Sequence, residues 1–337
     1  MSWYALGVSF VLALVLTPLV IALLRRAEIY DTPGERSSHS TATPRGGGVA
    51  VAIAGLSTLA LVWNGAGGPA IAVAVTATGF GFVGLADDLF DLSPNLRLAI
   101  QLTFGVISSV LLLNAAGLPT HLMVLAFGAT VFWLMSFVNA FNFMDGINGM
   151  SVAQACVAGT AWTILGVATG EPFLATAGAI QLGATLGFAP FNVPRARVFL
   201  GDVGSYFLGA WMAALAVVGL RAGLTPEAVL APMALYLIDT GSTLIWRVRS
   251  GHEWRQPHRH HVYQRLTDLG WSHSKTAAFA AAIIGLCALL GGLSATASLP
   301  ARVVADVGLI LAVVAYLDWP MVRRGEASTP TGAGVSN

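Results

Sequence analysis

Long apolar stretches, separated by short polar segments, dominate this chain of 337 residues. Hydrophobic residues make up 56% of the sequence and charged residues only 10%, which is too little charge to cover a water-soluble surface. Each stretch has about the length that an α-helix needs to cross a bilayer, roughly 20 residues. A backbone in lipid must satisfy its own hydrogen bonds, so the sequence predicts an all-α, polytopic integral membrane protein.

We predict about eleven membrane-spanning helices, with ten as the alternative count. One membrane-embedded domain then covers residues 1–319, and a short cytoplasmic tail covers 320–337. The predicted spans are 3–24, 47–63, 70–86, 97–113, 122–138, 150–169, 173–190, 205–221, 227–246, 276–296 and 301–319.

The basic residues predict the orientation of these helices. Arg25 and Arg26 directly follow the first apolar stretch and no basic residue precedes it, so we expect an uncleaved first helix with its N-terminus outside. Eleven spans then place all of the 17 Lys and Arg residues except Arg221 and Arg302 in the cytoplasm. The C-terminus is expected to be cytoplasmic as well.

Five polar segments interrupt the apolar sequence, and the predicted topology places all five on the cytoplasmic side. Ionisable residues kept in a membrane protein usually serve a function, so we expect the segments to form one site on the cytoplasmic face. They are SSHSTATPRGGG at 37–48, DDLFD at 87–91, NAFNFMDGING at 139–149, FLGDVGS at 199–205 and HRHH at 258–261.

The acidic residues of two segments predict a cation site. Asp87, Asp88 and Asp91 have helical spacings that bring their carboxylates to one side, where like charges need a cation. Asp202 lies between glycines that allow the backbone to approach a phosphate, and it is a second candidate ligand. Mg²⁺ prefers carboxylate oxygens and leaves positions open for phosphates, so a metal-bound diphosphate is indicated. A solvated acidic loop is the alternative.

Asparagines surround the next aspartate along the chain. Asp145 is accompanied by Asn139, Asn142 and Asn148, where an ordinary span would end in arginine and aromatic residues. Four hydrogen-bonding side chains together indicate ligand binding, although a helix cap and turn could explain each one singly.

The predicted cytoplasmic segment 247–275 carries six basic residues and five of the seven histidines. At its centre, His258, His260 and His261 surround Arg259. No thiolate is nearby to complete a zinc site, so phosphate binding is favoured over zinc. A basic cluster at the membrane surface is the third interpretation.

These features predict phosphoryl transfer to a lipid. In their order and places among the spans, DDLFD, NAFNFMDGING, FLGDVGS and HRHH resemble the motifs of the polyprenyl-phosphate N-acetylhexosamine-1-phosphate transferases, glycosyltransferase family 4. The resemblance runs from about residue 36 to 317. It implies an enzyme of the bacterial cytoplasmic (inner) membrane that transfers a sugar 1-phosphate from a UDP-sugar to undecaprenyl phosphate and releases UMP.

The resemblance also implies residue roles. Asp87 and Asp88 match the acidic pair near the reacting phosphates, and Asp87 is the candidate for deprotonating or orienting the lipid phosphate. Asp202, with Asp88, matches a ligand of Mg²⁺, for which Mn²⁺ is an alternative ion. Direct attack and a route through an aspartyl-phosphate are both open. The implied catalytic residues further include Asp145, His260 and His261, and the implied substrate-binding residues are Arg45, Asp91, Asn139, Asn142, Asn148, His258 and Arg259.

One departure bears on the donor, because Asn148 stands where the family element usually has a second aspartate. Together with RSSHSTATPRGGG, DGING, GDVGS and YQRL, it resembles the branch that starts lipopolysaccharide O-antigen chains with UDP-N-acetylfucosamine or UDP-N-acetylquinovosamine. A 6-deoxy-N-acetylhexosamine donor and membrane lipid are the implied partners. A homodimer is compatible with the resemblance, and a nucleic-acid partner is not expected.

Two other functions fit the sequence less well. A prenyltransferase of the UbiA type needs a second aspartate-rich motif like DDLFD, and GDVGS is not one. A transporter needs polar residues along a path through the membrane, for which Asp239 and Asp306 are the only candidates.

Overall fold

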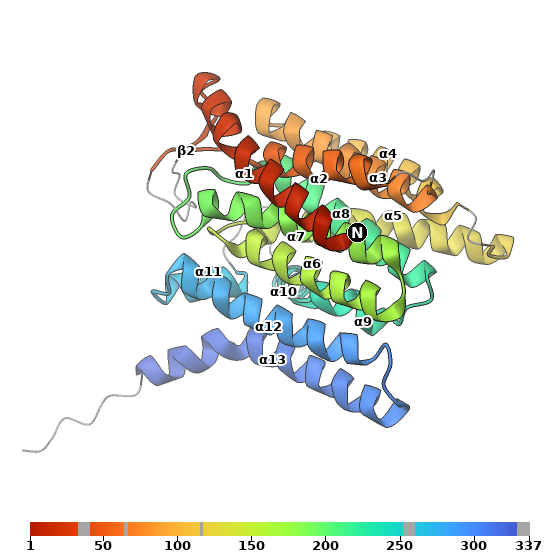
Figure 1. Ribbon diagram of the computed structural model, residues 1–337. Coiled ribbons are helices and arrows are strands. Elements are labelled where there is room, and N and C mark those ends of the chain that lie inside the picture. The colour runs from red at the N-terminus through yellow and green to blue at the C-terminus, as the bar shows by residue number, and fades with distance from the viewer. Residues whose placement is uncertain (33–40, 64–66, 115–116, 252–259, 329–337) are drawn as a thin grey trace, which may run out of the picture.

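A computed structural model of the chain describes residues 1–32, 41–63, 67–114, 117–251 and 260–328. Nearly all of the described chain is helical, and Figure 1 shows the helices lying side by side in one bundle. The helices are α1 (Ser2–Arg26), α2 (Gly48–Val62), α3 (Gly68–Phe90), α4 (Pro94–Leu113), α5 (Thr120–Met144), α6 (Met150–Thr169), α7 (Pro172–Asn192), α8 (Gly201–Arg221), α9 (Pro226–Leu230), α10 (Ala234–Arg249), α11 (Val262–Asp268), α12 (His273–Leu293) and α13 (Leu299–Ser328), with a 3₁₀ turn η1 (Ala231–Met233).

The predicted class is confirmed: within the described residues, ten helical segments are long and apolar enough to cross a membrane, so this is a multi-pass membrane protein. The second predicted span is the exception, because α2 has only 15 residues. At 1.5 Å per residue it extends roughly 22 Å, less than the hydrocarbon core of a bilayer. The ninth predicted span is a single segment from Pro226 to Arg249 that consists of α9, η1 and α10.

Helix α8 forms the centre of the bundle and is buried along nearly its whole length. It packs against α3 and α5, while α7 packs against α1 and α6. Large apolar side chains remain exposed on the outer helices, such as Val15 of α1, Leu125 of α5 and Val304 of α13. A lipid environment accounts for these exposed residues, because hydrocarbon solvates them without the cost that water would impose.

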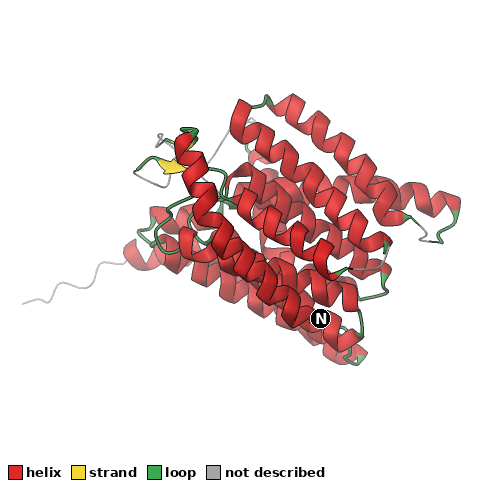
Figure 2. Ribbon diagram, turned by 45° about the horizontal axis from the view of Figure 1, so that its top comes forward, coloured by secondary structure: helices red, strands yellow, loops and turns green. Residues whose placement is uncertain are grey.

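A short antiparallel ladder lies beyond one end of the bundle (Figure 2). Its strands are β1 (Tyr30–Asp31) and β2 (Thr43–Pro44), with Tyr30 opposite Pro44. At the other end of the chain, α13 continues to Ser328, beyond the predicted start of the tail at residue 320. A helix can leave the membrane without ending, because its backbone hydrogen bonds remain satisfied in water.

Glycines allow the central helices to touch at the end of the bundle that carries the polar segments. A Cβ atom at Gly84 of α3 would lie 2.1 Å from the carbonyl oxygen of Asp202 in α8. A Cβ atom at Gly48 of α2 would lie equally close to the Cα of Gly204. Larger side chains would separate these backbones, so the glycines bring the DDLFD segment next to the FLGDVGS segment.

The first prediction tests this close contact. Gly84→Ala should destabilise the protein by about 1–3 kcal/mol or more, the usual cost of forcing extra atoms into a packed core. The readout is the melting temperature of the purified protein in detergent. The control is Gly128→Ala in α5, where an added Cβ meets nothing within 4 Å. Because alanine is the better helix former, this control should keep or raise the melting temperature. Equal effects of the two substitutions would contradict the packing argument.

Candidate functional site

The site begins where the segment before α2 pairs with the segment before α8. The backbone N–H of Phe199 donates to the Pro44 carbonyl at 2.8 Å, and the N–H of Gly47 donates to the Phe199 carbonyl at 2.9 Å. The N–H of Gly48 likewise donates to the Leu200 carbonyl at 2.8 Å. These bonds hold Arg45 beside the first turn of α8.

Asp88 caps α8 from the neighbouring helix α3. Its carboxylate accepts the backbone N–H groups of Asp202 at 3.0 Å and Val203 at 2.9 Å. N–H groups in the first turn of a helix have no partner within that helix, so Asp88 satisfies two of them and matches the positive end of the helix dipole. Gly201 has a φ of 76°, and a Cβ there would lie 2.7 Å from Asp88 Oδ2, so glycine is required on both counts.

Arg45 joins two of the predicted acidic residues. Its Nε lies 2.7 Å from Asp88 Oδ1, and its Nη2 lies 2.7 Å from Asp202 Oδ2. Burial opposes the charge on Arg45, but the carboxylates of Asp202 and Asp88 outweigh it and raise the pKa of Arg45 above its ordinary value. One guanidinium thus bridges two carboxylates and offsets one of their two negative charges.

The carboxylates of DDLFD have different partners, although the negative charges of Asp87 and Asp88 both act on the carboxyl group of Asp202. The shared cation that the sequence analysis expects remains a prediction. Asp87 is paired with Arg97 Nη1 at 2.7 Å and accepts the backbone N–H of Leu92 at 3.0 Å. Asp91 is exposed and ends α3 with a φ of 48°. Among the described residues, no three His, Cys, Asp or Glu side chains are grouped closely enough to hold a metal ion. Helical spacing predicted a common side for the three carboxylates. It did not reveal that Arg97 pairs with Asp87 and Arg45 with Asp88.

The asparagines have different partners. Asn142 donates through Nδ2 to Asp202 Oδ1 at 2.8 Å and to Ser205 Oγ at 3.0 Å, which ties the end of α5 to α8. Asn139 lies one turn earlier in α5 and donates to Gln101 Oε1 at 2.8 Å. Asn142 therefore faces the site, whereas Asn139 supports the contact of α5 with α4.

A polar cavity of about 330 Å³ lies at this junction. It collects predicted site residues from three of the five polar segments: Arg45, Asn142, Asp145, Asn148 and Asp202. Asp87, Asp88, Asp91 and Asn139 lie outside its lining.

The cavity lining also includes residues that the sequence analysis did not select, namely Asn192, Gln264 and His273. Asn192, at the end of α7, accepts the backbone N–H of Gly149 at 2.8 Å and donates to the Val198 carbonyl at 3.2 Å, so it fixes the loop that carries Asp145. The sequence did contain a signal for Asn192 and His273, because each is a polar residue at the end of an apolar helix: Asn192 is the last residue of α7 and His273 the first residue of α12. Gln264 gave no such signal.

Asp145 follows the last residue of α5 and faces this cavity. Burial raises the pKa of its carboxyl group from 3.8 to about 7, and the negative charges of Asp202 and Asp88 act in the same direction. A carboxyl group that titrates near neutral pH in a cavity is typical of a functional site.

The described histidines of HRHH lie apart from the cavity lining. His261 is buried, and its Nδ1 lies 3.1 Å from Asp239 Oδ1 in α10. His260 is exposed and meets the ring of Trp246 edge to face, with 4.8 Å between centroids. His258 and Arg259 lie outside the described residues, so their predicted roles remain predictions.

The cavity provides oxygen ligands suitable for Mg²⁺. Asp145 and Asp202 both face it, and Asn142 adds an amide. Mg²⁺ commonly takes one or two carboxylates and completes its shell with water and substrate phosphates. Asp145 and Asp202 fit that pattern by position, although Oδ1 of Asp202 accepts from Asn142 and its Oδ2 pairs with Arg45, so a metal ion would replace one of these contacts. Asp88 is likewise engaged on both oxygens, and it lies outside the cavity lining.

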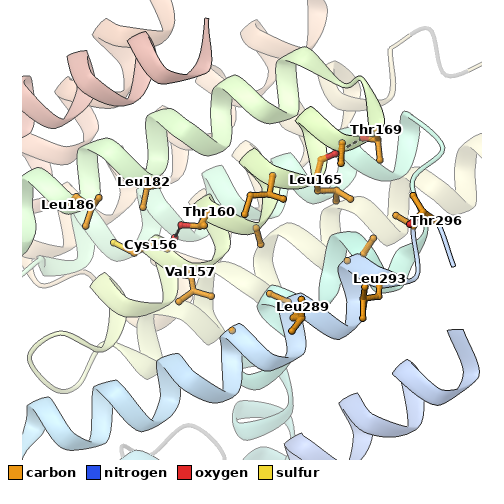
Figure 3. A pocket seen from close by; sticks show the side chains of 18 residues that line it. Cys156, Val157, Thr160, Leu165, Thr169, Leu182, Leu186, Leu289, Leu293 and Thr296 are labelled. Atoms are coloured by element: carbon orange, nitrogen blue, oxygen red, sulfur yellow. Dashed lines mark hydrogen bonds between the residues drawn. The ribbon is translucent and has the colours of Figure 1, made fainter. Parts of the chain in front are cut away.

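A larger cavity, of about 760 Å³, lies between α6, α7 and α12 (Figure 3). Side chains such as Val157, Leu182 and Leu289 line it, and its described lining contains no acidic or basic residue. The larger volume does not make it the better candidate, because it offers hydrocarbon contact without groups for chemistry.

The second prediction concerns the buried charge of Asp145. Because its folded-state pKa lies above the unfolded value, the folded protein keeps a proton that the unfolded chain releases between about pH 4 and 7. Stability should therefore fall as the pH rises through this window. In EDTA, Asp145→Asn should melt at a higher temperature than the unaltered protein at pH 8, and at nearly the same temperature at pH 4.5.

Asp91→Asn, at the exposed end of α3, is the matched control and should show no such pH-dependent difference. If Asp145→Asn melts below the unaltered protein at pH 8, the claim that its ionised form destabilises the fold is wrong.

Comparison with known proteins agrees with the motifs. The family model described as glycosyl transferase family 4 matches residues 70–220. A probable undecaprenyl-phosphate N-acetylglucosaminyl 1-phosphate transferase of Bacillus subtilis (strain 168) is 26% identical over 281 residues, covering 79% of this chain and 77% of that protein. A decaprenyl-phosphate N-acetylglucosaminephosphotransferase of Mycobacterium leprae (strain TN) is 30% identical, with 77% and 75% covered.

A third relative comes from another branch. The phospho-N-acetylmuramoyl-pentapeptide-transferase of Desulforamulus reducens (strain ATCC BAA-1160 / DSM 100696 / MI-1) is 30% identical over 306 residues, covering 81% of this chain and 89% of that protein. Similarity at this level extends over most of both chains, and the residues matched by the family model include Asn142, Asp145, Asn148 and Asp202. The chain therefore belongs to glycosyl transferase family 4.

Proposed function

We propose that the protein transfers an N-acetylhexosamine 1-phosphate from a UDP-sugar to undecaprenyl phosphate and releases UMP. The observation that carries this proposal is the cavity in which Arg45, Asn142, Asp145 and Asp202 meet. Its 330 Å³ lies at the small end of the range for ligand pockets. Relatives named as an undecaprenyl-phosphate N-acetylglucosaminyl 1-phosphate transferase and a phospho-N-acetylmuramoyl-pentapeptide-transferase support the reaction class.

In the proposed reaction, an oxygen of the lipid phosphate attacks the β-phosphorus of the UDP-sugar. The bond between that phosphorus and the bridging oxygen breaks, UMP leaves with the electron pair, and the sugar keeps its 1-phosphate on the lipid. Asp202 and Asp145 would hold Mg²⁺, which supplies neutralisation of the diphosphate when bound. Arg45 presents a guanidinium at the cavity wall and can bind a phosphate oxygen as well as the carboxylates.

Asp87 remains our candidate for deprotonating or orienting the lipid phosphate. It lies one turn from the end of α3, is held by Arg97 and acts on the carboxyl group of Asp202, so its carboxylate has a fixed position beside the site. A transporter function has less support, because the mid-membrane candidate Asp239 is bonded to His261 and Tyr316.

We further propose that the site faces the cytoplasm of a bacterial inner membrane, and that the donor is a 6-deoxy-N-acetylhexosamine used to start O-antigen or a related envelope glycan. Asn148 supports the donor proposal, because it lines the cavity with an amide where the related proteins usually have an aspartate. An amide donates as well as accepts hydrogen bonds, so it suits a different substituent on the sugar.

The third prediction tests the reaction. Purified protein with undecaprenyl phosphate and a UDP-sugar should release UMP only when Mg²⁺ or Mn²⁺ is present. Asp202→Asn should lower kcat by more than about a hundredfold, the scale for loss of a group that stabilises developing charge. Gly128→Ala is the control and should retain full turnover. Undiminished UMP release in excess EDTA would refute the role of the metal.

The fourth prediction tests the donor. With a panel of UDP-sugars, kcat/KM should be higher for UDP-N-acetylfucosamine or UDP-N-acetylquinovosamine than for UDP-N-acetylglucosamine. Asn148→Asp should change the ratio between donors more than it lowers the best rate, because a mismatched polar group in a site discriminates strongly. Equal or better use of UDP-N-acetylglucosamine would exclude the 6-deoxy proposal and leave the reaction class intact.

A further inference from the structure

A second polar cluster, built around Asp239 of α10, includes His261 and lies outside the lining of the polar cavity. The Asp239 side chain is 1% exposed, and its carboxylate reaches two other helices. Its Oδ1 lies 3.1 Å from His261 Nδ1, while its Oδ2 accepts the backbone N–H of Val262 at 3.1 Å and the hydroxyl of Tyr316 at 3.0 Å. Asp239 thus joins the start of α11 to α10 and α13.

A carboxylate is stable in the protein interior only while the groups that donate hydrogen bonds to it stay in place. A buried carboxylate without hydrogen-bond partners costs several kcal/mol. The charge of Asp239 therefore holds its hydrogen-bonding groups in position, and those groups in turn stabilise the charge. Thr243 adds a fourth contact at 3.4 Å. All the shorter contacts come from outside α10, which means that the cluster ties segments together and does not merely complete one helix.

Helix α11 connects the Asp239 cluster to the end of α5 and to the loop that holds Asp145. The hydroxyl of Tyr263 donates to the Phe143 carbonyl at 3.1 Å. A Cβ atom at Gly146 would lie 2.1 Å from that same hydroxyl, so the loop and the tyrosine fit together without space between them. Gln264, the next residue of α11, lines the cavity, and its Oε1 accepts the backbone N–H of His261 at 3.2 Å.

We propose that Asp239 is a positioning residue for the UDP-sugar donor. It fixes the start of α11, and α11 in turn sets the position of the cavity wall formed by Gln264 and by the loop 145–148. The link is continuous, from Asp239 through Val262 and Tyr263 to the loop next to Asp145. Asp239 itself touches no substrate in this arrangement. The proposal rests on the proposed transfer reaction for its kinetic test, but its structural test is independent of any activity.

The kinetic test compares Asp239→Asn and Tyr316→Phe with the unaltered full-length protein. We expect KM for the UDP-sugar to rise about tenfold or more in Asp239→Asn while kcat changes by less than about threefold, because donor binding is disturbed and the reacting groups are not. Tyr316→Phe removes one hydrogen bond to Asp239, so it should also raise KM for the UDP-sugar, but by less than Asp239→Asn does. KM for undecaprenyl phosphate should stay within about twofold.

The control is Thr76→Val in α3. Thr76 is fully buried and its hydroxyl bonds to the Ala72 carbonyl at 2.6 Å, yet it lies roughly 16 Å along α3 from Asp87. This substitution should lower the melting temperature and leave KM unchanged. A fall in kcat with unchanged KM in both Asp239→Asn and Tyr316→Phe, as expected from loss of active protein, would overturn the proposal. If Asp239→Asn does not fold, Tyr316→Phe decides the kinetic test.

Hydrogen exchange measured by mass spectrometry gives the second test and needs no turnover. In Tyr316→Phe, and in Asp239→Asn if it folds, exchange should increase in 262–268 and in 143–149 and stay unchanged in 48–62. Unchanged exchange in 143–149 would overturn the link to the cavity. If the unaltered protein releases no UMP with any UDP-sugar, the proposed reaction fails, whereas the exchange result still decides whether Asp239 holds the loop.

Discussion

The bond between the Asp88 carboxylate and the first turn of α8 is the contact on which the site depends. Asp88 accepts the N–H groups of Asp202 and Val203, and Arg45 joins the same carboxylate to the side chain of Asp202. Three distant segments are therefore fixed at one point. Because α8 is also the central helix of the bundle, its first turn is held rigidly, and the cavity beside it receives a defined shape.

This arrangement also explains how a protein with few charges can bury several of them. Asp87 has Arg97 and Asp88 has Arg45, so each of these carboxylates meets a cation at 2.7 Å. Among the described residues Asp145 has no such ion pair. Burial raises its pKa to about 7, although contact with Ser151 and the charge of Arg45 act in the opposite direction. The ion pair of Asp88 with Arg45 lies at the first turn of α8, and Asp145 faces the cavity, where a bound cation and phosphates could compensate its charge.

The sequence allowed the helical membrane fold and the meeting of several polar segments to be predicted, because apolar length and segment order carry that information. Arg45, Asn142, Asp145, Asn148 and Asp202 were selected in this way and line one cavity. Partners across the fold were not predictable. Helical spacing placed Asp87, Asp88 and Asp91 together, but it could not reveal that Arg97 pairs with Asp87 and Arg45 with Asp88. Similarly, Gln264 and His273 reach the cavity only through the packing of α11 and α12.

The central claim is that the polar cavity between the end of α5, the end of α7 and the start of α8 holds the donor diphosphate. An electron cryomicroscopy structure of the protein with Mg²⁺ and a UDP-sugar tests it most directly. The account predicts the diphosphate in the 330 Å³ cavity, in contact with Arg45 and near Asp202 and Asp145. A nucleotide sugar bound elsewhere, with this cavity filled only by water, would contradict it.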